Sequence, residues 1–229
     1  RPPYIFDDNI PLLHFRDAET GEGLATLLSV ANHPESLWAS NPYLSSDYMH
    51  FVRAYLREGL PEVRDAEGAL LKPALEGVKG VTLTFAGALG GLLNPGSQVP
   101  ARRYDGVDVR EVGFDKADAI GQRVAEIALS ARARGEWAEL TGSEGGAPQL
   151  SFSTKPLLIP VTNPVFLLGG YVLKLFNRDM YNAVPLGGTS FAPSEPRVLS
   201  EVSVARLGDV TLITAPGEVF PELLTGGYP

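Results

Sequence analysis

Apolar residues along the first part of the chain are spaced as in two β-strands followed by a helix. Residues 12–15 and 23–32 form the two strand patterns, and a turn-rich segment, 17–21, lies between them. The second strand pattern is almost entirely apolar, which predicts a strand covered on both faces. It ends in Asn32-His33-Pro34.

A helix is predicted from Asp47 onward, because apolar side chains recur there every three or four residues. These are Tyr48, Phe51, Val52, Tyr55 and Leu56. Ser45, Ser46 or Asp47 can cap the helix, and Gly59 with Pro61 ends it. A second helix is predicted after a cap at Asp115, with Ile120, Val124, Ile127 and Ala128 on its apolar side.

Strand patterns dominate the rest of the chain. Residues 81–85 alternate between apolar and polar and predict a strand with one buried face, followed by a loop of small residues at 87–95. Further strands are expected around 150–153 and over 202–207 and 210–215, the last two joined by a tight Gly208-Asp209 turn. The fold class is therefore α/β with an α+β tendency, a mixed β-sheet with flanking helices.

The longest apolar stretch, 157–176, is interrupted by prolines, glycines, an asparagine and a lysine. A membrane-spanning helix needs about 20 uninterrupted apolar residues. The stretch is instead interpreted as a buried strand, a turn at Asn163-Pro164, and a second segment, 165–176, that is buried or lines a groove. The protein is not expected to be transmembrane.

Charge and composition narrow the chemistry. The chain has 27 acidic and 19 basic residues, a net charge of −8, which argues against a nucleic-acid partner. It has no cysteine, so disulfides and thiolate metal sites are excluded, and a transition metal would need His, carboxylate, Tyr or water as ligands. The absence of cysteine fits an exported bacterial protein as well as a cytosolic one.

Polar or small residues follow three predicted strands at the point where each strand ends. These are His33, the loop from Gly90 to Asn94, and Glu218. Strand-to-loop junctions of this kind hold ligands in open α/β sheets. From the residues alone, His33 is either a metal ligand or base, or a histidine hydrogen-bonded within its loop. Glu218 is likewise either a carboxylate ligand or part of a turn.

The order of these motifs resembles the neutral ceramidase family. Asn32-His33-Pro34 is followed by Asn41 and by Leu44-Ser45-Ser46-Asp47-Tyr48, similar to the family's metal-ligating His, Asn and helix-opening Ile-Ser-x-Asp. The segment 85–95 is similar to the loop that ends Gly-Asp-x-Ser-Pro or Gly-Asp-x-Asn-Pro. Ala215-Pro216-Gly217-Glu218 matches the Pro-Gly-Glu whose Glu binds zinc.

The resemblance implies a zinc-dependent hydrolase of a ceramide-like N-acyl substrate, with water as the attacking group. His33 and Glu218 would be two of four zinc ligands, and Gly90, Gly91, Asn41 and Asp47 would contact the substrate. The family's His-x-His lies upstream of this chain and its Tyr downstream, and Tyr228 is too close to Glu218 to serve. Residues 1–229 are therefore expected to form a single incomplete catalytic domain, whose partners are a lipid-like substrate and the remaining segments of the same protein.

Two positions depart from the family's pattern. Leu92 stands where the family usually has Asp, and Asn94 stands where ceramidases have their serine. Asn94 cannot be a nucleophile, but it can donate a hydrogen bond to a developing oxyanion, which is the catalytic role assigned to it. A non-catalytic ceramidase-like binding protein and a metal-free structural or interaction domain stay as alternatives. Secretion or a periplasmic location, and contact with a membrane surface, are expected from the resemblance.

Overall fold

The computed structural model describes residues 6–39, 41–91, 93, 98–142, 146–173, 175, 179–181 and 196–226. The chain divides into two compact units. The first comprises Arg1–Ala138 together with Glu218–Pro229, and the second comprises Glu139–Gly217. The prediction that both are parts of one incomplete catalytic domain stays a prediction.

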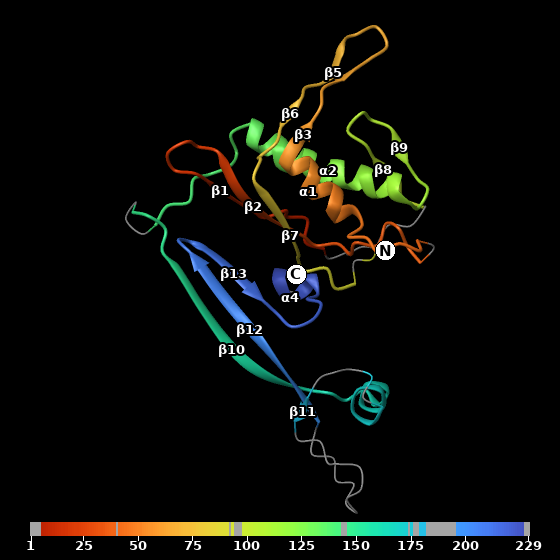
Figure 1. Cartoon of the computed structure of the whole chain (residues 1–229), viewed down its shortest axis with the longest axis vertical. Helices are drawn as coiled ribbons and strands as arrows, with labels where there is room; N and C mark the ends of the chain where they lie inside the picture. The colour runs from red at the N-terminus through yellow and green to blue at the C-terminus, as the bar shows by residue number, and fades with distance from the viewer. Residues whose placement is uncertain are drawn as a thin grey trace, which may run out of the picture. The chain divides into compact units, whose positions relative to one another are not determined.

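The first unit is built on a three-stranded sheet (Figure 1). Its strands are β1 (Leu12–Arg16), β2 (Gly23–Val30) and β7 (Val81–Ala86), in the order β1-β2-β7. Strand β1 runs antiparallel to β2, whereas β7 runs parallel to it. A mixed sheet with helices beside it confirms the predicted α/β class.

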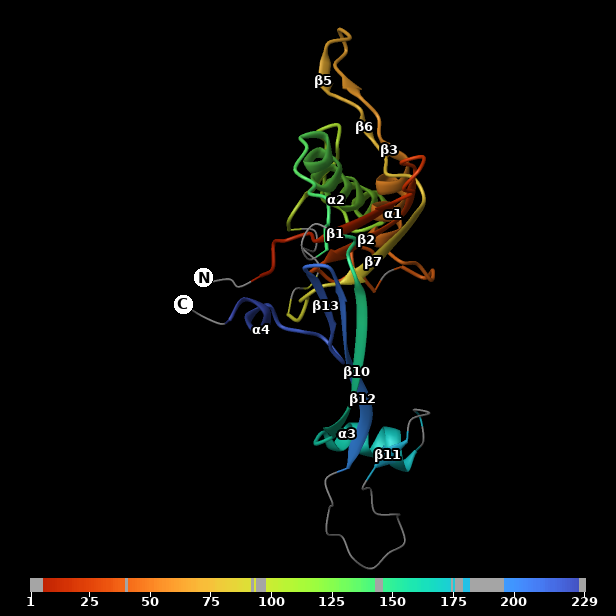
Figure 2. The same cartoon turned by 90° about the vertical axis from the view of Figure 1, so that its left-hand side faces the viewer.

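Two long helices, α1 (Tyr48–Glu58) and α2 (Phe114–Ala133), lie side by side in both views (Figures 1 and 2). Asp47 caps α1 as predicted, since its carboxylate accepts a hydrogen bond from the Tyr48 amide at 2.6 Å. The predicted cap of α2 was wrong: Gly113 precedes the helix, and Asp115 lies in its first turn. An acidic residue there still favours the helix, because the positive end of the helix dipole is close.

The two helices approach closely at Gly121. A Cβ atom on this residue would lie 2.2 Å from the Phe51 Cβ, so no larger side chain fits the crossing. The core that forms between the helices and the sheet is apolar. It is made of Leu28, Val30, Leu37, Tyr48, Met49, Val52, Leu56, Leu60, Leu75, Val78, Tyr104, Ala117, Val124, Ala125, Ala128 and Leu129. Ile127 was expected on the apolar side of α2 but is 42% exposed.

The sheet is buried mainly on the face that packs on α1. On β7 this inner face is polar: the Thr82 hydroxyl donates to the Arg53 carbonyl at 3.0 Å, and Thr84 accepts from the Arg53 guanidinium at 2.9 Å. The alternate residues Val81, Leu83 and Phe85 are 60%, 45% and 51% exposed. The alternation predicted for this strand is confirmed, but its apolar side is the outer one. Strand β2 is buried on its inner face, whereas its outer face is half-buried and Leu24 is 53% exposed. The expectation that residues 23–32 are covered on both faces was therefore wrong.

Two hairpins that the sequence did not predict also belong to the described part of the first unit. They pair β3 (Gly59–Leu60) with β6 (Leu75–Glu76), β4 (Val63–Arg64) with β5 (Leu70–Lys72), and β8 (Ala101–Arg102) with β9 (Asp108–Val109). The β3–β6 and β4–β5 pairs form one arm that extends from the end of α1 (Figure 1).

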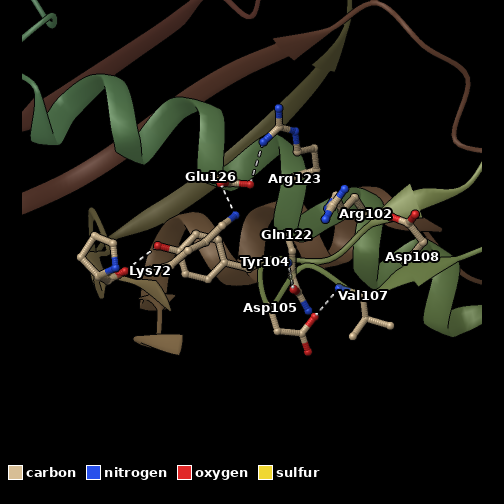
Figure 3. A network of polar contacts seen from close by, with 10 residues as sticks. Lys72, Arg102, Tyr104, Asp105, Val107, Asp108, Gln122, Arg123 and Glu126 are labelled. Carbon is tan, nitrogen blue, oxygen red and sulfur yellow. Dashed lines mark hydrogen bonds and ion pairs between the residues drawn. The ribbon is translucent and has the colours of Figure 1, made fainter. Parts of the chain in front are cut away.

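Polar contacts join this arm and the β8–β9 hairpin to α2 (Figure 3). The Lys72 ammonium binds the Glu126 carboxylate at 2.7 Å and lies 4.4 Å from the centre of the Tyr104 ring. The Tyr104 hydroxyl donates to the Pro73 carbonyl at 2.5 Å, and its amide donates to the Gln122 side chain at 2.9 Å. The three elements are therefore fixed to one another by a single network.

The second unit is a four-stranded antiparallel sheet. Strand β12 (Arg197–Leu207) pairs with β10 (Leu150–Pro160), with β11 (Met180–Tyr181) and with β13 (Val210–Thr214). The tight turn predicted at Gly208-Asp209 joins β12 to β13 and is confirmed, with Gly208 at a φ of 56°.

The apolar stretch 157–176 differs from the prediction. After β10, Asn163 caps a short helix, α3 (Pro164–Phe166), that continues into a π-helical turn, η2 (Leu167–Val172). Its described side chains are exposed rather than buried, at 72% for Val165, 56% for Phe166 and 53% for Leu168. Among the described residues of the whole chain, no helix is long and apolar enough to cross a membrane.

Candidate functional site

The candidate site lies where two parallel strands of the first unit end. Because β2 and β7 are parallel neighbours, the loops that leave their carboxyl ends begin at the same edge of the sheet. His33 follows β2, and the loop that starts at Gly87 follows β7. The Gly87 amide donates to the Val30 carbonyl at 2.9 Å, which holds the two loops together where they start.

The segment that carries Glu218 packs on the glycine loop. The Gly90 amide donates to the Val219 carbonyl at 2.8 Å. A Cβ atom on Gly90 would lie 2.9 Å from the same carbonyl oxygen, and Gly91 has a φ of 78°, so glycine suits both positions. The described backbone contact of Gly90 is therefore to a neighbouring segment, and the role of Gly90 and Gly91 in substrate binding stays a prediction.

This packing brings His33 and Glu218 together although they lie far apart in the sequence. The His33 Nε2 is 3.0 Å from the Glu218 Oε1. The His33 side chain is 13% exposed, whereas that of Glu218 is 60% exposed. An imidazole held in place by its surroundings thus meets a carboxylate that is open to solvent on the same edge of the sheet.

The pair suits zinc as two ligands of a larger set. Imidazole nitrogen and carboxylate oxygen are both common zinc ligands, at about 2.0–2.2 Å from the ion. Two ligand atoms of a tetrahedral site are then about 3.3 Å apart, close to the 3.0 Å found between Nε2 and Oε1. Within the described residues, no group of three or more His, Asp or Glu side chains surrounds a common point. The metal-ligand role of His33 and Glu218 stays a prediction.

Of the other predicted site residues, some lie in the part of the chain that the structure describes and others do not. Asn94 and Leu92 lie outside the described residues, as does Tyr228. Asn41 turns its side chain onto its own loop, donating to the Tyr43 carbonyl at 2.8 Å and accepting from the Tyr43 amide at 3.2 Å. Asp47 is 4% exposed.

Asn41 and Asp47 nevertheless share a cavity next to the loop of His33. The cavity has a volume of about 440 Å³. Its wall is formed by Pro34, Glu35, Leu37, Trp38, Ala39, Asn41, Tyr43, Ser45 and Asp47. Its place beside His33 makes it the candidate substrate pocket of the first unit.

The sequence analysis did not name Ser36, and it placed Tyr48 in the helix-opening motif and the apolar stripe without giving its hydroxyl a role. The Ser36 hydroxyl donates to the Asp47 carboxylate, and the Tyr48 hydroxyl donates to the Asn32 carbonyl at 2.7 Å. The signal for such a role is the polar hydroxyl of Tyr48 on an otherwise apolar face, which needs a hydrogen-bond partner when buried.

The chain matches no protein-family model, and no curated protein matches it by sequence. Solved structures match its fold, and two of them are ceramidases. The neutral ceramidase from Pseudomonas aeruginosa is 16% identical, with a TM-score of 0.51 over 95% of this chain and 36% of the ceramidase chain. The chain has a ceramidase-like fold. A structure titled "Ceramidase complexed with C2" is 15% identical, with a TM-score of 0.52 over 90% of this chain and 36% of the other.

These matches confirm the predicted likeness at the level of the fold. The chain spans about a third of the length of the ceramidase chains that it matches, 36% in both cases. The ceramidase-like fold covers nearly all of this chain, as the sequence motifs predict.

Proposed function

We propose that this chain supplies part of the active site of a ceramidase-like hydrolase that uses zinc to cleave the amide bond of a lipid-type N-acyl substrate. The observation that carries the proposal is the 3.0 Å approach of the His33 Nε2 to the Glu218 Oε1 at the edge of a sheet with a ceramidase-like fold. An imidazole and a carboxylate, two side-chain types that commonly bind zinc, meet there from distant parts of the sequence.

Each residue has a distinct task in this proposal. His33 offers a neutral nitrogen lone pair, and Glu218 offers a negative charge that offsets the charge of a cation. Zinc, when bound, polarises the amide carbonyl and lowers the pKa of a water molecule toward neutrality. Asn94, which follows Gly90 and Gly91 in the sequence, donates a hydrogen bond to the carbonyl oxygen as negative charge develops on it. The cavity beside the His33 loop, with Asn41 in its wall, holds the part of the substrate next to this bond.

The test is the zinc content of the protein at its full natural length. The wild type should carry about one equivalent, since the ligand set of a catalytic site holds one ion. His33→Ala should lower zinc affinity by more than the roughly 10–100-fold that removal of an outer partner costs. Glu218→Gln should also lower it, because the amide no longer offsets the charge of the ion. His50→Ala, at an exposed histidine of α1, is the matched control.

Hydrolysis of short-chain N-acyl sphingoid amides, measured on the same samples, tests whether activity depends on the bound zinc. His33→Ala should abolish it and His50→Ala should leave it intact. A folded wild-type protein that takes up no zinc when zinc is supplied would contradict the proposal.

A second function, lipid-amide binding without catalysis, is favoured by one observation. Leu92 and Asn94 stand where ceramidases carry an aspartate and a serine, and a leucine can neither orient a neighbour nor accept a proton. A protein with this function would bind the same N-acyl amides and release no fatty acid, whether or not it carries zinc.

A further inference from the structure

The loop that carries His33 is attached to the start of helix α1 on both sides of the histidine. The loop leaves β2 after Val30 and reaches α1 at Asp47 and Tyr48. Nothing in the sequence spacing fixes how this loop presents its histidine. Hydrogen bonds of Asp47 and Tyr48 reach the loop just before and just after His33.

Tyr48 holds the loop just before His33. Its side chain is 1% exposed, and its hydroxyl donates to the carbonyl of Asn32, the residue that precedes His33, at 2.7 Å. A buried hydroxyl that loses its partner costs free energy, so this bond is retained when the core is packed. The peptide group between Asn32 and His33 is thereby fixed to the core.

Asp47 holds the loop just after His33. Its carboxylate accepts from the Ser36 hydroxyl, from the Leu37 amide at 2.8 Å and from the Tyr48 amide at 2.6 Å. All of these residues are buried, Ser36 at 1% exposed and Leu37 at 5%. Hydrogen bonds that a charged group accepts are stronger than those between neutral groups. The Asp47 carboxylate therefore holds the loop against the start of the helix.

The backbone of Asp47 supports the same interpretation. Its φ of 53° and ψ of −144° lie in a region that residues other than glycine rarely adopt. Such a conformation persists only where the surroundings enforce it. The hydrogen bonds to Ser36, Leu37 and Tyr48 stabilise it.

We propose that Asp47 and Tyr48 are positioning residues that hold the His33 imidazole against Glu218. This inference rests on the proposed function for its metal-binding consequence. It also replaces the substrate-binding role predicted for Asp47, because its carboxylate oxygens already accept bonds from the loop and the helix. The substrate would then meet the exposed side of the loop, and Asp47 would act through His33.

The experiment measures zinc affinity of the protein at its full natural length, by competition with a chelator, in Tyr48→Phe and Asp47→Asn. Tyr48→Phe keeps the ring in the core and removes only the hydroxyl, and Asp47→Asn keeps the shape and removes the charge. Both should weaken zinc binding by roughly 10–100-fold, as loss of a partner that orients a ligand does. Tyr48→Phe stands as the decisive variant if Asp47→Asn does not fold.

Matched controls come from helix α1 and from its neighbour α2. Tyr55→Phe also removes a hydroxyl from α1, one that donates to Asp118 at 2.6 Å and does not touch the His33 loop. Asp118→Asn likewise removes a carboxylate that accepts bonds from Tyr55 and Gln122. Both controls should bind zinc as tightly as the wild type, although each also removes hydrogen bonds within the first unit.

A second measurement does not depend on zinc. The ring-nitrogen signals of His33 in the NMR spectrum of zinc-free protein should shift or broaden in Tyr48→Phe and remain unchanged in Tyr55→Phe. Wild-type protein that binds no zinc would overturn the proposed function, and the ring signals would then decide the positioning role alone. Zinc that binds through His33, with affinity and ring signals unaltered in both variants, would overturn the positioning role and leave the function standing.

Discussion

The three histidines of the chain lie in three different environments. His33 meets a carboxylate at the edge of the sheet, His50 is exposed on helix α1, and His14 lies within strand β1. The His14 Nδ1 is 2.9 Å from the Thr26 hydroxyl on the neighbouring strand, and its ring packs 5.6 Å from that of Trp137. Of the three, His33 is the one proposed to bind a ligand, and the structural role expected for His14 agrees with its contacts.

His14 should make the stability of the fold depend on pH. Burial, followed by the charges of Arg132 and Arg16, lowers the pKa of His14 below its ordinary 6.5. The unfolded chain then binds more protons than the folded one below that value, so stability is full above it and is lost as pH falls through the lowered pKa. The free energy of unfolding in urea should be lower at pH 5.5 than at pH 7.5.

Two histidine variants test whether His14 causes this pH dependence of stability. His14→Gln should reduce the difference between the two pH values, since glutamine keeps a hydrogen-bonding group near Thr26 and cannot gain a proton. His50→Gln changes an exposed histidine and should leave the difference as it is. An equal difference in wild type and His14→Gln would show that other groups cause it.

Among the contacts that join the hairpin arm to α2, one is an ion pair. Lys72 is at the end of β5, and Glu126 lies on α2, where it is 14% exposed. Burial alone would raise the pKa of Glu126, but hydrogen bonds from Lys72 and Arg123 outweigh it and hold that pKa below its ordinary value. The contribution of the pair is therefore present at neutral pH and is lost as pH falls through the lowered pKa.

Glu126→Gln should lower the free energy of unfolding by about 1 kcal/mol, because a hydrogen bond to a charged group contributes more than a neutral one, and Lys72 keeps partial access to water. The loss should be smaller at pH 4 than at pH 7. Glu136→Gln removes an exposed partner of Arg134 and should change stability much less. Equal losses in the two variants, measured by urea unfolding, would mean that the network does not hold the arm.

The elements that the sequence predicted are those with a local cause. The stripe on α1 and the cap at Asp47 involve neighbouring residues, and so does the Gly208-Asp209 turn. The short strands of the hairpins are too short to show a periodic pattern of apolar residues. One contact of the arm joins Lys72 to Glu126, a residue 54 positions away in the sequence. Such partners are set by the tertiary fold, which no local pattern encodes.

At the candidate site, too, local sequence patterns predicted some features and tertiary contacts determined the others. Family-like motifs pointed to His33 and Glu218, and the structure brings their side chains together across 185 positions. The motif around Asp47 was also noticed, but its contacts with Ser36 and Leu37 depend on how the loop folds back. Sequence patterns identified the candidate residues, and the three-dimensional contacts show which side chains they meet.

At the scale of the whole chain, apolar patterns located the strands but did not predict which face of each strand is buried. The outer face of the central sheet carries Phe15, Val81, Leu83 and Phe85, which are 39%, 60%, 45% and 51% exposed. Polar threonines occupy the inner face of β7, where Arg53 satisfies them. A cluster of large apolar side chains on one face of a sheet is typical of a surface that packs on other protein.

This outer face should make the 229-residue chain associate with itself when it is studied alone. Sedimentation over a series of protein concentrations should show a mass that rises with concentration, because association removes the exposed side chains from water. Leu83→Lys should shift the association to higher concentration, since burying an ammonium group at the contact is costly. Val107→Lys alters an apolar residue that is 52% exposed at the turn of the β8–β9 hairpin, away from this face, and should associate like the wild type. A chain that stays monomeric throughout the series, or a Leu83→Lys variant that associates as readily as the wild type, would exclude the outer face as the contact surface.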